Sequence, residues 1–216
     1  MKDVTLLIAH PDDEALFLWP FLDRVKRIVC ASNDRHNAER AFCRERGTCL
    51  SEVGVLLGCD IVQFSNPSEF YRSGARGGEL KGIANLLAGH LRDAEIIATH
   101  NAWGEYGHLD HIVCHHIART VQAQTGCELL VSDIATEINW LPIRAWHQGT
   151  ELSLAPDGRS GSILFRKPLS DRPVVSYGIR SEIDRPLFDR IKAIYDARGC
   201  WTWAWEPTEK CRVYSL

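Results

Sequence analysis

The chain has 216 residues, of which 45% are hydrophobic and 25% are charged, and its formal net charge is −3 at pH 7. These values are typical of a globular protein of one domain, here residues 1–216, that buries a core without the help of disulfides. The absence of a basic block argues against nucleic acid as a partner. No apolar run approaches the ~20 residues that a membrane-spanning helix needs.

Short apolar segments alternate with longer helical patterns through the first half of the chain. The sequence predicts strands over 4–9, 27–32, 60–65, 95–100 and 127–132. It predicts helices over 14–26, 37–57 with an interruption near Gly47, 80–91 and 108–124. This alternation indicates βαβ units, and hence an α/β fold with a mainly parallel sheet flanked by helices.

The second half has a different pattern and predicts a smaller, β-rich C-terminal part. A hairpin is expected over 151–166 around a Pro-Asp-Gly turn, and an amphipathic helix over 185–199 that a glycine ends. In a strand over 200–207, Trp201, Trp203 and Trp205 would share one face. That face would pack within the fold, line a sugar groove or join subunits in a homo-oligomer.

The cysteines indicate a reducing compartment. There are eight, no two have CxxC spacing, and most lie in apolar stretches, so buried thiols in a cytoplasmic protein are expected. The N-terminus becomes charged too early to be a signal peptide.

Two polar clusters each follow a predicted strand. The first, "HPDDE" at 10–14, comes directly after the first strand, and the second, "GHLDH" at 107–111, follows the fourth strand after a short loop. Because ligands bind at the carboxyl ends of strands in an open parallel sheet, both clusters are expected at the same edge.

The residue types in these clusters are those of a catalytic metal site. His10, Asp13 and His111 supply two imidazoles and a carboxylate, a common set for one zinc ion per chain with a fourth position left to water. Nitrogen and oxygen ligands accept Fe²⁺ as well. Asp12 is a candidate general base, and His108 is a candidate to stabilise an oxyanion or protonate a leaving amine. The alternative is that these are acidic and capping residues at two helix starts.

The two motifs, "AHPDDE" at 9–14 and "GHLDH" at 107–111, resemble those of the PIG-L/LmbE family of zinc-dependent deacetylases. The resemblance implies a Rossmann-like, LmbE-like fold and removal of an N-acetyl group from a GlcNAc-type amino sugar or glycoconjugate. It implies zinc ligands at His10, Asp13 and His111, a general base at Asp12, an acid or oxyanion-stabilising histidine at His108, and a tyrosine aimed at the reacting carbonyl at Tyr106.

Several residues near the clusters are weaker candidates. Arg72, Arg76 and Trp103 lie in loops after strands and are candidates for substrate binding. Asp110 and Glu14 are candidates to orient the residues of the site. His100, His115 and His116 are interpreted as structural or surface residues.

Three alternative functions fit the same residues. An amidase acting on a larger N-acyl group or a thiol conjugate would use the same chemistry. A metal-dependent phosphohydrolase is also compatible, because clusters of carboxylates and histidines serve two-metal sites. The third alternative is a sugar-binding protein that has kept the fold without catalysis.

Overall fold

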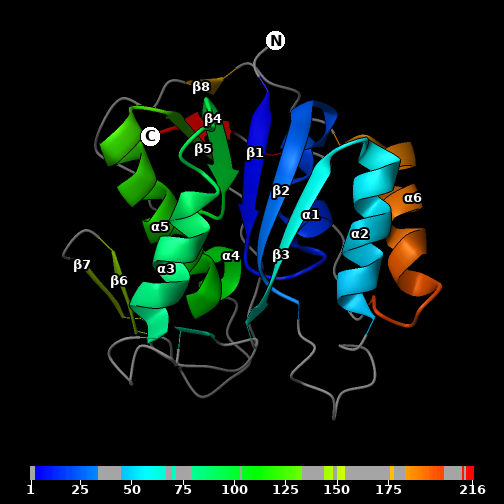
Figure 1. Ribbon diagram of the computed structural model, residues 1–216, viewed down its shortest axis with the longest axis horizontal. Coiled ribbons are helices and arrows are strands. Elements are labelled where there is room, and N and C mark those ends of the chain that lie inside the picture. Colours follow the sequence, from blue (N-terminus) through cyan, green and yellow to red (C-terminus); the bar gives the residue numbers. More distant parts are fainter. Residues whose placement is uncertain are drawn as a thin grey trace.

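A seven-stranded sheet forms the centre of the protein in the computed structural model (Figure 1). The structure describes residues 3–33, 45–66, 70–71, 79–102, 104–132, 144–147, 150–153, 176–177, 183–201, 211 and 213–216. The strands of this sheet are β1 (Val4–Ile8), β2 (Val25–Ser32), β3 (Asp60–Asn66), β4 (Ile96–Thr99), β5 (Glu128–Ser132), β8 (Ser176–Tyr177) and β9 (Val213–Ser215).

The strand order is β3-β2-β1-β4-β5-β9-β8, and the first five strands along this order are parallel. The last two are antiparallel to their neighbours. The order 3-2-1-4-5 reverses direction between β1 and β4, as in a Rossmann-like fold, where ligands bind at this switch point. The expected α/β fold with a mainly parallel sheet is confirmed.

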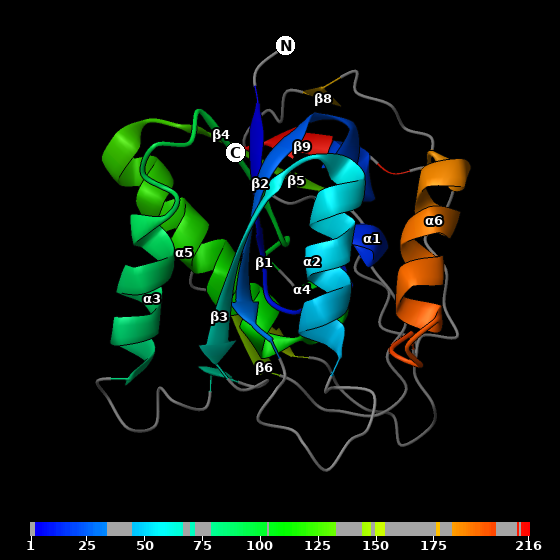
Figure 2. The same ribbon diagram turned by 45° about the vertical axis from the view of Figure 1, so that its right-hand side comes forward.

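Helices cover both faces of the sheet. Figure 2 shows α3 (Glu79–Gly89) and α5 (Leu109–Thr125) on one face and α2 (Arg46–Leu57) and α6 (Arg185–Asp196) on the other. Alternate residues of β1 enter the two hydrophobic clusters, with Leu6 and Ile8 in the cluster that includes α2 and α6, and Leu7 in the one that includes α3 and α5. This double burial explains why β1 is apolar at nearly every position.

The predicted helix over 14–26 is wrong. The structure has a short helix α1 (Asp13–Leu16), then a 3-10 helix η1 (Trp19–Arg24), and β2 already begins at Val25. Pro20 lies in the first turn of η1, where it is tolerated, but it lacks the amide hydrogen that a continuous α-helix needs. Val25 instead pairs with Val4 of β1.

Other predicted elements agree with the structure where it describes them. The helices expected over 80–91, 108–124 and 185–199 are α3, α5 and α6. The loop before α5 contains a further short helix, α4 (Gly104–Gly107). The helix expected over 37–57 is α2 from Arg46 onward, and residues 34–44 lie outside the described residues.

The second half is described only in part. β6 (Arg144–His147) pairs with β7 (Thr150–Ser153) in a separate antiparallel pair, so residues 151–153 pair with the segment before them. The rest of the hairpin predicted over 151–166, and residues 202–207 with Trp203 and Trp205, lie outside the described residues. Seven cysteines are described, and all seven are free thiols. Across the described ranges, every helix is too short or too polar to cross a bilayer.

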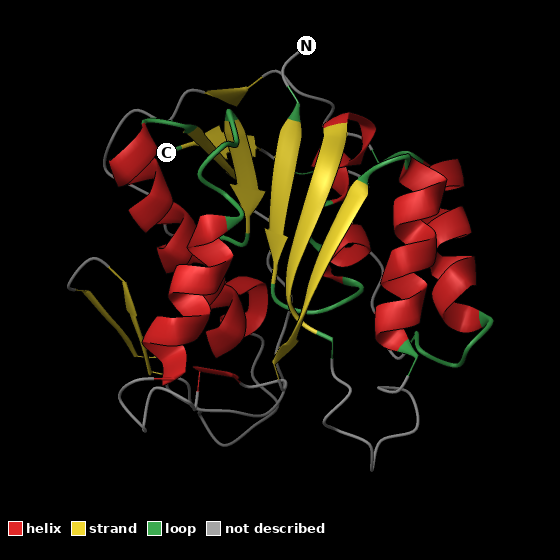
Figure 3. Ribbon diagram, viewed as in Figure 1, coloured by secondary structure: helices red, strands yellow, loops and turns green. Residues whose placement is uncertain are grey.

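The parallel strands place the two polar clusters at one edge. In Figure 3 the loop after β1 and the helix α4 lie at the carboxyl ends of the parallel strands. This edge is where the candidate site is found.

Candidate metal centre

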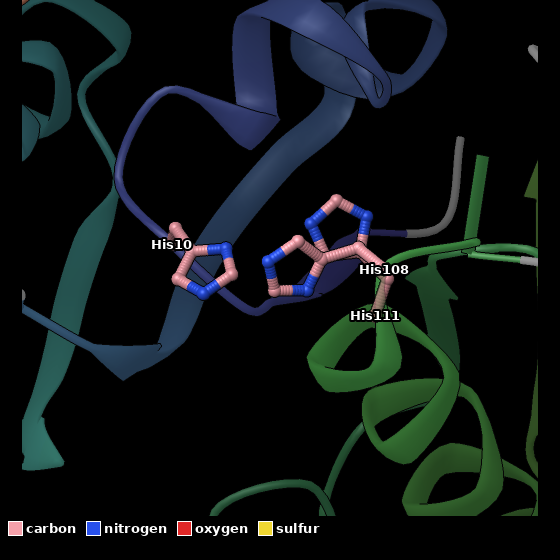
Figure 4. Close-up of side chains that lie close together, drawn as sticks. All are labelled: His10, His108 and His111. Carbon is pink, nitrogen blue, oxygen red and sulfur yellow. The ribbon is translucent and has the colours of Figure 1, made fainter. Parts of the chain in front are cut away.

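The rings of His10, His108 and His111 lie together at this edge (Figure 4). His10 comes from the loop after β1, while His108 and His111 come from the start of α5. One ligand atom from each of the three residues lies within 4.8 Å of the other two. Ring centroids are 5.5 Å apart for His10 and His111, and 4.7 Å apart for His108 and His111.

Asp13 lies between the two predicted histidine ligands. Its Oδ2 is 3.6 Å from Nδ1 of His10, and its Oδ1 is 3.5 Å from Nε2 of His111. Two ligand atoms on one tetrahedral zinc ion, each bonded at about 2.0–2.1 Å, lie roughly 3.4 Å apart. The donor types suit a divalent ion. The groups whose ligand atoms all lie within 4.8 Å of one another are His10 with His108 and His111, and Asp13 with His100 and His111, so the predicted set of His10, Asp13 and His111 draws on both groups.

His100 is the residue that the sequence interpretation left out of the site, and it is fully buried there. One ligand atom each from His100, Asp13 and His111 forms a second group within 4.8 Å, and Nε2 of His100 lies 3.3 Å from Oδ2 of Asp13. However, Nε2 of His100 accepts a hydrogen bond of 3.1 Å from the amide of Ala9, and Nδ1 lies 2.9 Å from Oε2 of Glu105. Both ring nitrogens are therefore used within the protein, which favours a structural role.

The pKa of His100 bears on this assignment. Burial lowers it, but Glu105 and Asp13 raise it more strongly, to about 9. A proton on Nε2 would nevertheless point at the amide hydrogen of Ala9. The hydrogen bond from Ala9 therefore identifies a ring that is unprotonated at Nε2.

Each of the two histidine ligands that we predicted contacts a buried carboxylate through its other ring nitrogen. Nε2 of His10 is 3.0 Å from Oδ2 of Asp110, and Nδ1 of His111 is 2.8 Å from Oε2 of Glu105. Asp110 thus contacts a candidate ligand and also accepts the amide hydrogen of Tyr71 through Oδ1.

Glu105 was missed by the sequence interpretation, because a glutamate in a glycine-containing loop reads as a surface residue. Burial raises its pKa, but the adjacent imidazoles of His100 and His111 lower the pKa by more, to about 2. The carboxylate is therefore ionised and acts only as an acceptor. The one feature of the sequence that could have indicated Glu105 is its position in the segment between His100 and the second motif.

Asp12, the predicted base, has an unusual backbone and a buried charge partner. Its φ is 96°, in the left-handed region, and only 1% of the residue is exposed. Nη2 of Arg46 lies 2.5 Å from its Oδ1, and the same guanidinium donates to the carbonyl of Pro11. Burial raises the pKa of Asp12 to about 7, although Arg46 lowers it. Arg46 follows a segment without a recognisable motif and was also missed.

His108 caps α5. Its Nδ1 accepts a hydrogen bond of 3.2 Å from the amide of Asp110, so Nε2 carries the ring hydrogen. Burial lowers the pKa of His108 well below its usual value, and the neighbouring His111 and His10 lower it further. The ring is therefore neutral and able to donate from Nε2.

Glu14 contacts the turn that carries Asp12. Its Oε2 accepts the amide hydrogen of Asp12 at 3.0 Å, and its Oε1 accepts the hydroxyl hydrogen of Tyr195 in α6 at 2.8 Å. Burial raises the pKa of Glu14 to about 8, and the nearby Asp12 adds to this shift. Tyr195 lies far from both motifs in the sequence and was not predicted.

The side chains of the other four predicted residues are not among those that the structure describes. Arg72, Arg76 and Trp103 fall outside the described residues. Tyr106 lies within α4, but its side chain is not among those described.

Solved structures with a similar fold include several deacetylases. A deacetylase–teicoplanin complex from the teicoplanin biosynthesis pathway is 10% identical, with a TM-score of 0.57 over 98% of this chain and 97% of that chain. The A40926 pseudoaglycone deacetylase Dbv21 is 14% identical, with a TM-score of 0.56 over 92% and 82% of the two chains. The zinc inhibited form of the teicoplanin deacetylase Orf2 is 10% identical, with a TM-score of 0.56 over 98% and 97%.

At these identities the likeness shows a shared fold. No curated protein sequence matches the chain. A family model described as PIG-L, GlcNAc-PI de-N-acetylase, matches residues 5–122, which include both motifs and more than half of the chain. By this match the chain belongs to the PIG-L family of de-N-acetylases.

Proposed function

We propose that this chain is a zinc-dependent hydrolase that removes the N-acetyl group from a GlcNAc-type amino sugar or glycoconjugate, releasing acetate and a free amine. The observation that carries the proposal is the position of Asp13, 3.5–3.6 Å from one nitrogen each of His10 and His111, with Asp12 beside it. The family description and the deacetylases that share the fold support the reaction class.

His10, Asp13 and His111 would hold the metal ion. A divalent ion there supplies Lewis acidity, which polarises an acetyl carbonyl and lowers the pKa of a bound water to about 7. Fe²⁺ is an alternative, because nitrogen and oxygen ligands accept it. The teicoplanin deacetylase Orf2 has a zinc inhibited form, so an excess of zinc has to be tested separately from one equivalent.

The proton transfers fall to Asp12 and His108. Asp12 takes a proton from the water that attacks the acetyl carbonyl, and its pKa of about 7 suits a base that works near neutral pH. Arg46 holds one oxygen of Asp12 in place. His108 donates from Nε2 to the oxyanion that develops on the carbonyl oxygen. The amine leaves after protonation by Asp12 or His108.

Substrate recognition is proposed for residues that follow β3 and β4 in the sequence. We assign the tyrosine hydroxyl that contacts the reacting carbonyl to Tyr106, which lies in α4 between the end of β4 and the start of α5. Arg72, Arg76 and Trp103 belong to the segments after β3 and β4, so they are proposed to bind the sugar.

One assay tests the proposal. The purified chain, loaded with one equivalent of Zn²⁺ or Fe²⁺, is incubated with a panel of N-acetylated sugars, nucleotide sugars and glycoconjugates, with a chelator-treated sample as control. Free amine and acetate should appear in equal amounts and only in the metal-loaded samples. Release of a larger acid would support an amidase instead, and release of phosphate with two metal ions per chain would support a phosphohydrolase.

A further inference from the structure

Glu105 is a fully buried carboxylate that lies in α4, between the end of β4 and the start of α5. Its φ is 56°, and among the described residues only Asp12 shares a positive φ without being glycine. A side chain with a Cβ is disfavoured in this left-handed conformation. The contacts of the carboxylate explain why a glutamate is nevertheless held there.

The two oxygens of Glu105 accept hydrogen bonds from three groups. Oε2 lies 2.8 Å from Nδ1 of His111 and 2.9 Å from Nδ1 of His100. Oε1 accepts the amide hydrogen of Asn101 at 2.9 Å, and Oδ1 of Asn101 accepts the amide hydrogen of Glu105 at 3.2 Å. Because Nε2 of His100 accepts the amide hydrogen of Ala9, the ring hydrogen of His100 lies on Nδ1 and is donated to Oε2. The same oxygen faces Nδ1 of His111, which places the ring hydrogen of His111 on Nδ1 as well.

This protonation pattern determines which nitrogen of His111 can bind a metal. With the hydrogen on Nδ1, the lone pair of His111 is on Nε2, the atom that lies 3.5 Å from Oδ1 of Asp13. The ring of His100 stacks on that of His111 with centroids 3.8 Å apart, and Phe17 contacts the ring of His111 at 5.5 Å. The hydrogen bond from Nδ1 therefore fixes which way the His111 ring points, and the neighbouring rings restrict its rotation.

The same contacts connect the two halves of the site. His100 accepts the amide hydrogen of Ala9, the residue before His10, and donates to Glu105. Glu105 in turn holds His111 at the start of α5. A continuous line of buried hydrogen bonds thus runs from the end of β1 to the first turn of α5.

We propose that Glu105 is a positioning residue of the metal centre, which orients His111 for metal binding through Nε2. The inference rests on the proposed function, because it requires a metal ion bound by His10, Asp13 and His111. A carboxylate that accepts from the far nitrogen of a histidine ligand fixes the ring and makes the near nitrogen a stronger donor, and removing such a partner typically costs 10–100-fold in metal affinity.

The test is a measurement of metal affinity. The dissociation constants for Zn²⁺ and Co²⁺ are determined for the purified, metal-free full chain by competition with a chromophoric chelator. Glu105→Gln keeps the size of the side chain but removes its charge, and the affinity should fall 10–100-fold. The visible absorption of the Co²⁺-loaded protein should also change. Glu95→Gln, at an exposed carboxylate before β4, is the matched control and should leave both unchanged.

A second control separates positioning from support of the loop. Asn101→Ala removes the oxygen that accepts the amide hydrogen of Glu105 but leaves the contacts with His100 and His111. It should lower the melting temperature of the metal-free chain without weakening metal binding. If Glu105→Gln behaved in the same way, with lower stability and unchanged affinity, the inference would be overturned.

The remaining outcomes of this experiment also support or overturn the role of Glu105. If Glu105→Gln does not fold, Glu105→Asp keeps the charge at a shorter reach, and its metal affinity should still fall several-fold. An unchanged affinity would overturn the inference while leaving the proposed function intact. If the unmodified chain bound neither ion, the proposed metal centre would fail, and the inference with it.

Discussion

Asp12 has a left-handed backbone conformation, and its carboxylate forms an ion pair with Arg46. We predict that Asp12→Asn lowers kcat by about 10²–10⁴-fold, because the amide keeps the shape of the side chain but cannot take a proton from water. Bound metal, measured by elemental analysis, should stay at one equivalent, since the proposed ligands are untouched. Near-normal turnover at unchanged metal content would show that another group is the base.

His108 has two roles on its two ring nitrogens, and these can be separated. Nδ1 caps α5, while Nε2 is proposed to donate to the oxyanion. Because asparagine is a strong helix N-cap, His108→Asn should preserve stability yet lower kcat by about 10²–10³-fold. His108→Ala should lose similar activity and in addition about 1 kcal/mol of stability in urea unfolding. Equal activity in His108→Asn and the unmodified chain would remove His108 from the mechanism.

The sequence predicted a metal centre built from two short motifs, but the contacts that residues outside these motifs make with it, from Arg46, Glu105 and Tyr195, were not predicted. His10, Asp13 and His111 were recognisable because their types and spacing suit a metal and both clusters follow strands. Glu105 and His100 are part of the centre only because β1, β4 and α5 converge. His100 then contacts Ala9 after β1, and Glu105 contacts both His100 and His111. Such a contact has no signature in local spacing.

At the scale of elements, α6 reaches the centre although it lies outside residues 5–122. Tyr195 in α6 donates to Glu14, which holds the amide of Asp12. We predict that Tyr195→Phe lowers the free energy of unfolding by about 1–3 kcal/mol, because Glu14 is left as a buried acceptor with one partner fewer. Urea denaturation measures this effect.

The matched control for this change is Tyr214→Phe in β9. Tyr214 is partly buried, and in the described part of the chain its hydroxyl makes no hydrogen bond that would be lost. The stability of Tyr214→Phe should stay within about 0.5 kcal/mol of the unmodified chain. Equal effects of the two substitutions would show that the contact with Glu14 contributes nothing.

The strands of the parallel sheet were easier to predict than the helices between them. β1, β4 and β5 are buried on both faces, so each is a nearly continuous apolar run bounded by polar residues. The segment 14–26 is also apolar, and its periodicity does not distinguish a helix from a 3-10 turn followed by a strand. The segment ends in a strand because Val25 pairs with Val4 of β1. This contact forms only in the folded chain, so the local pattern does not predict it.

At the scale of the whole molecule, the centre gathers five buried carboxylates although the net charge of the chain is only −3. They belong to Asp12, Asp13, Glu14, Glu105 and Asp110. Those of the five that are ionised need partners in the protein interior. In the metal-free protein, part of the compensation comes from a proton on His10. Burial lowers the pKa of His10, but the hydrogen bonds and charges of Asp110 and Asp13 raise it by more, so that the pKa is about 10. A divalent ion would take over this role.

This exchange predicts how metal and pH act together on the stability of the fold. Because the folded pKa of His10 is above its ordinary value of 6.5, the proton stabilises the metal-free chain fully below pH 6.5, and this contribution is lost as pH rises toward 10. A metal ion requires the unprotonated ring and displaces the proton. The stabilisation that the metal gives, about 2.7 kcal/mol at a free concentration 100 times its dissociation constant, should therefore grow with pH.

The measurement is the rise in melting temperature on adding one equivalent of Zn²⁺ at pH 6.5 and at pH 8. The rise should be larger at pH 8, because each proton displaced changes the apparent affinity by up to about tenfold per pH unit. His10→Gln has no imidazole to deprotonate and should show little rise at either pH. A rise at pH 6.5 equal to or greater than that at pH 8 would mean that His10 does not bind the ion, and the centre would have to be rebuilt around Asp13, His100 and His111.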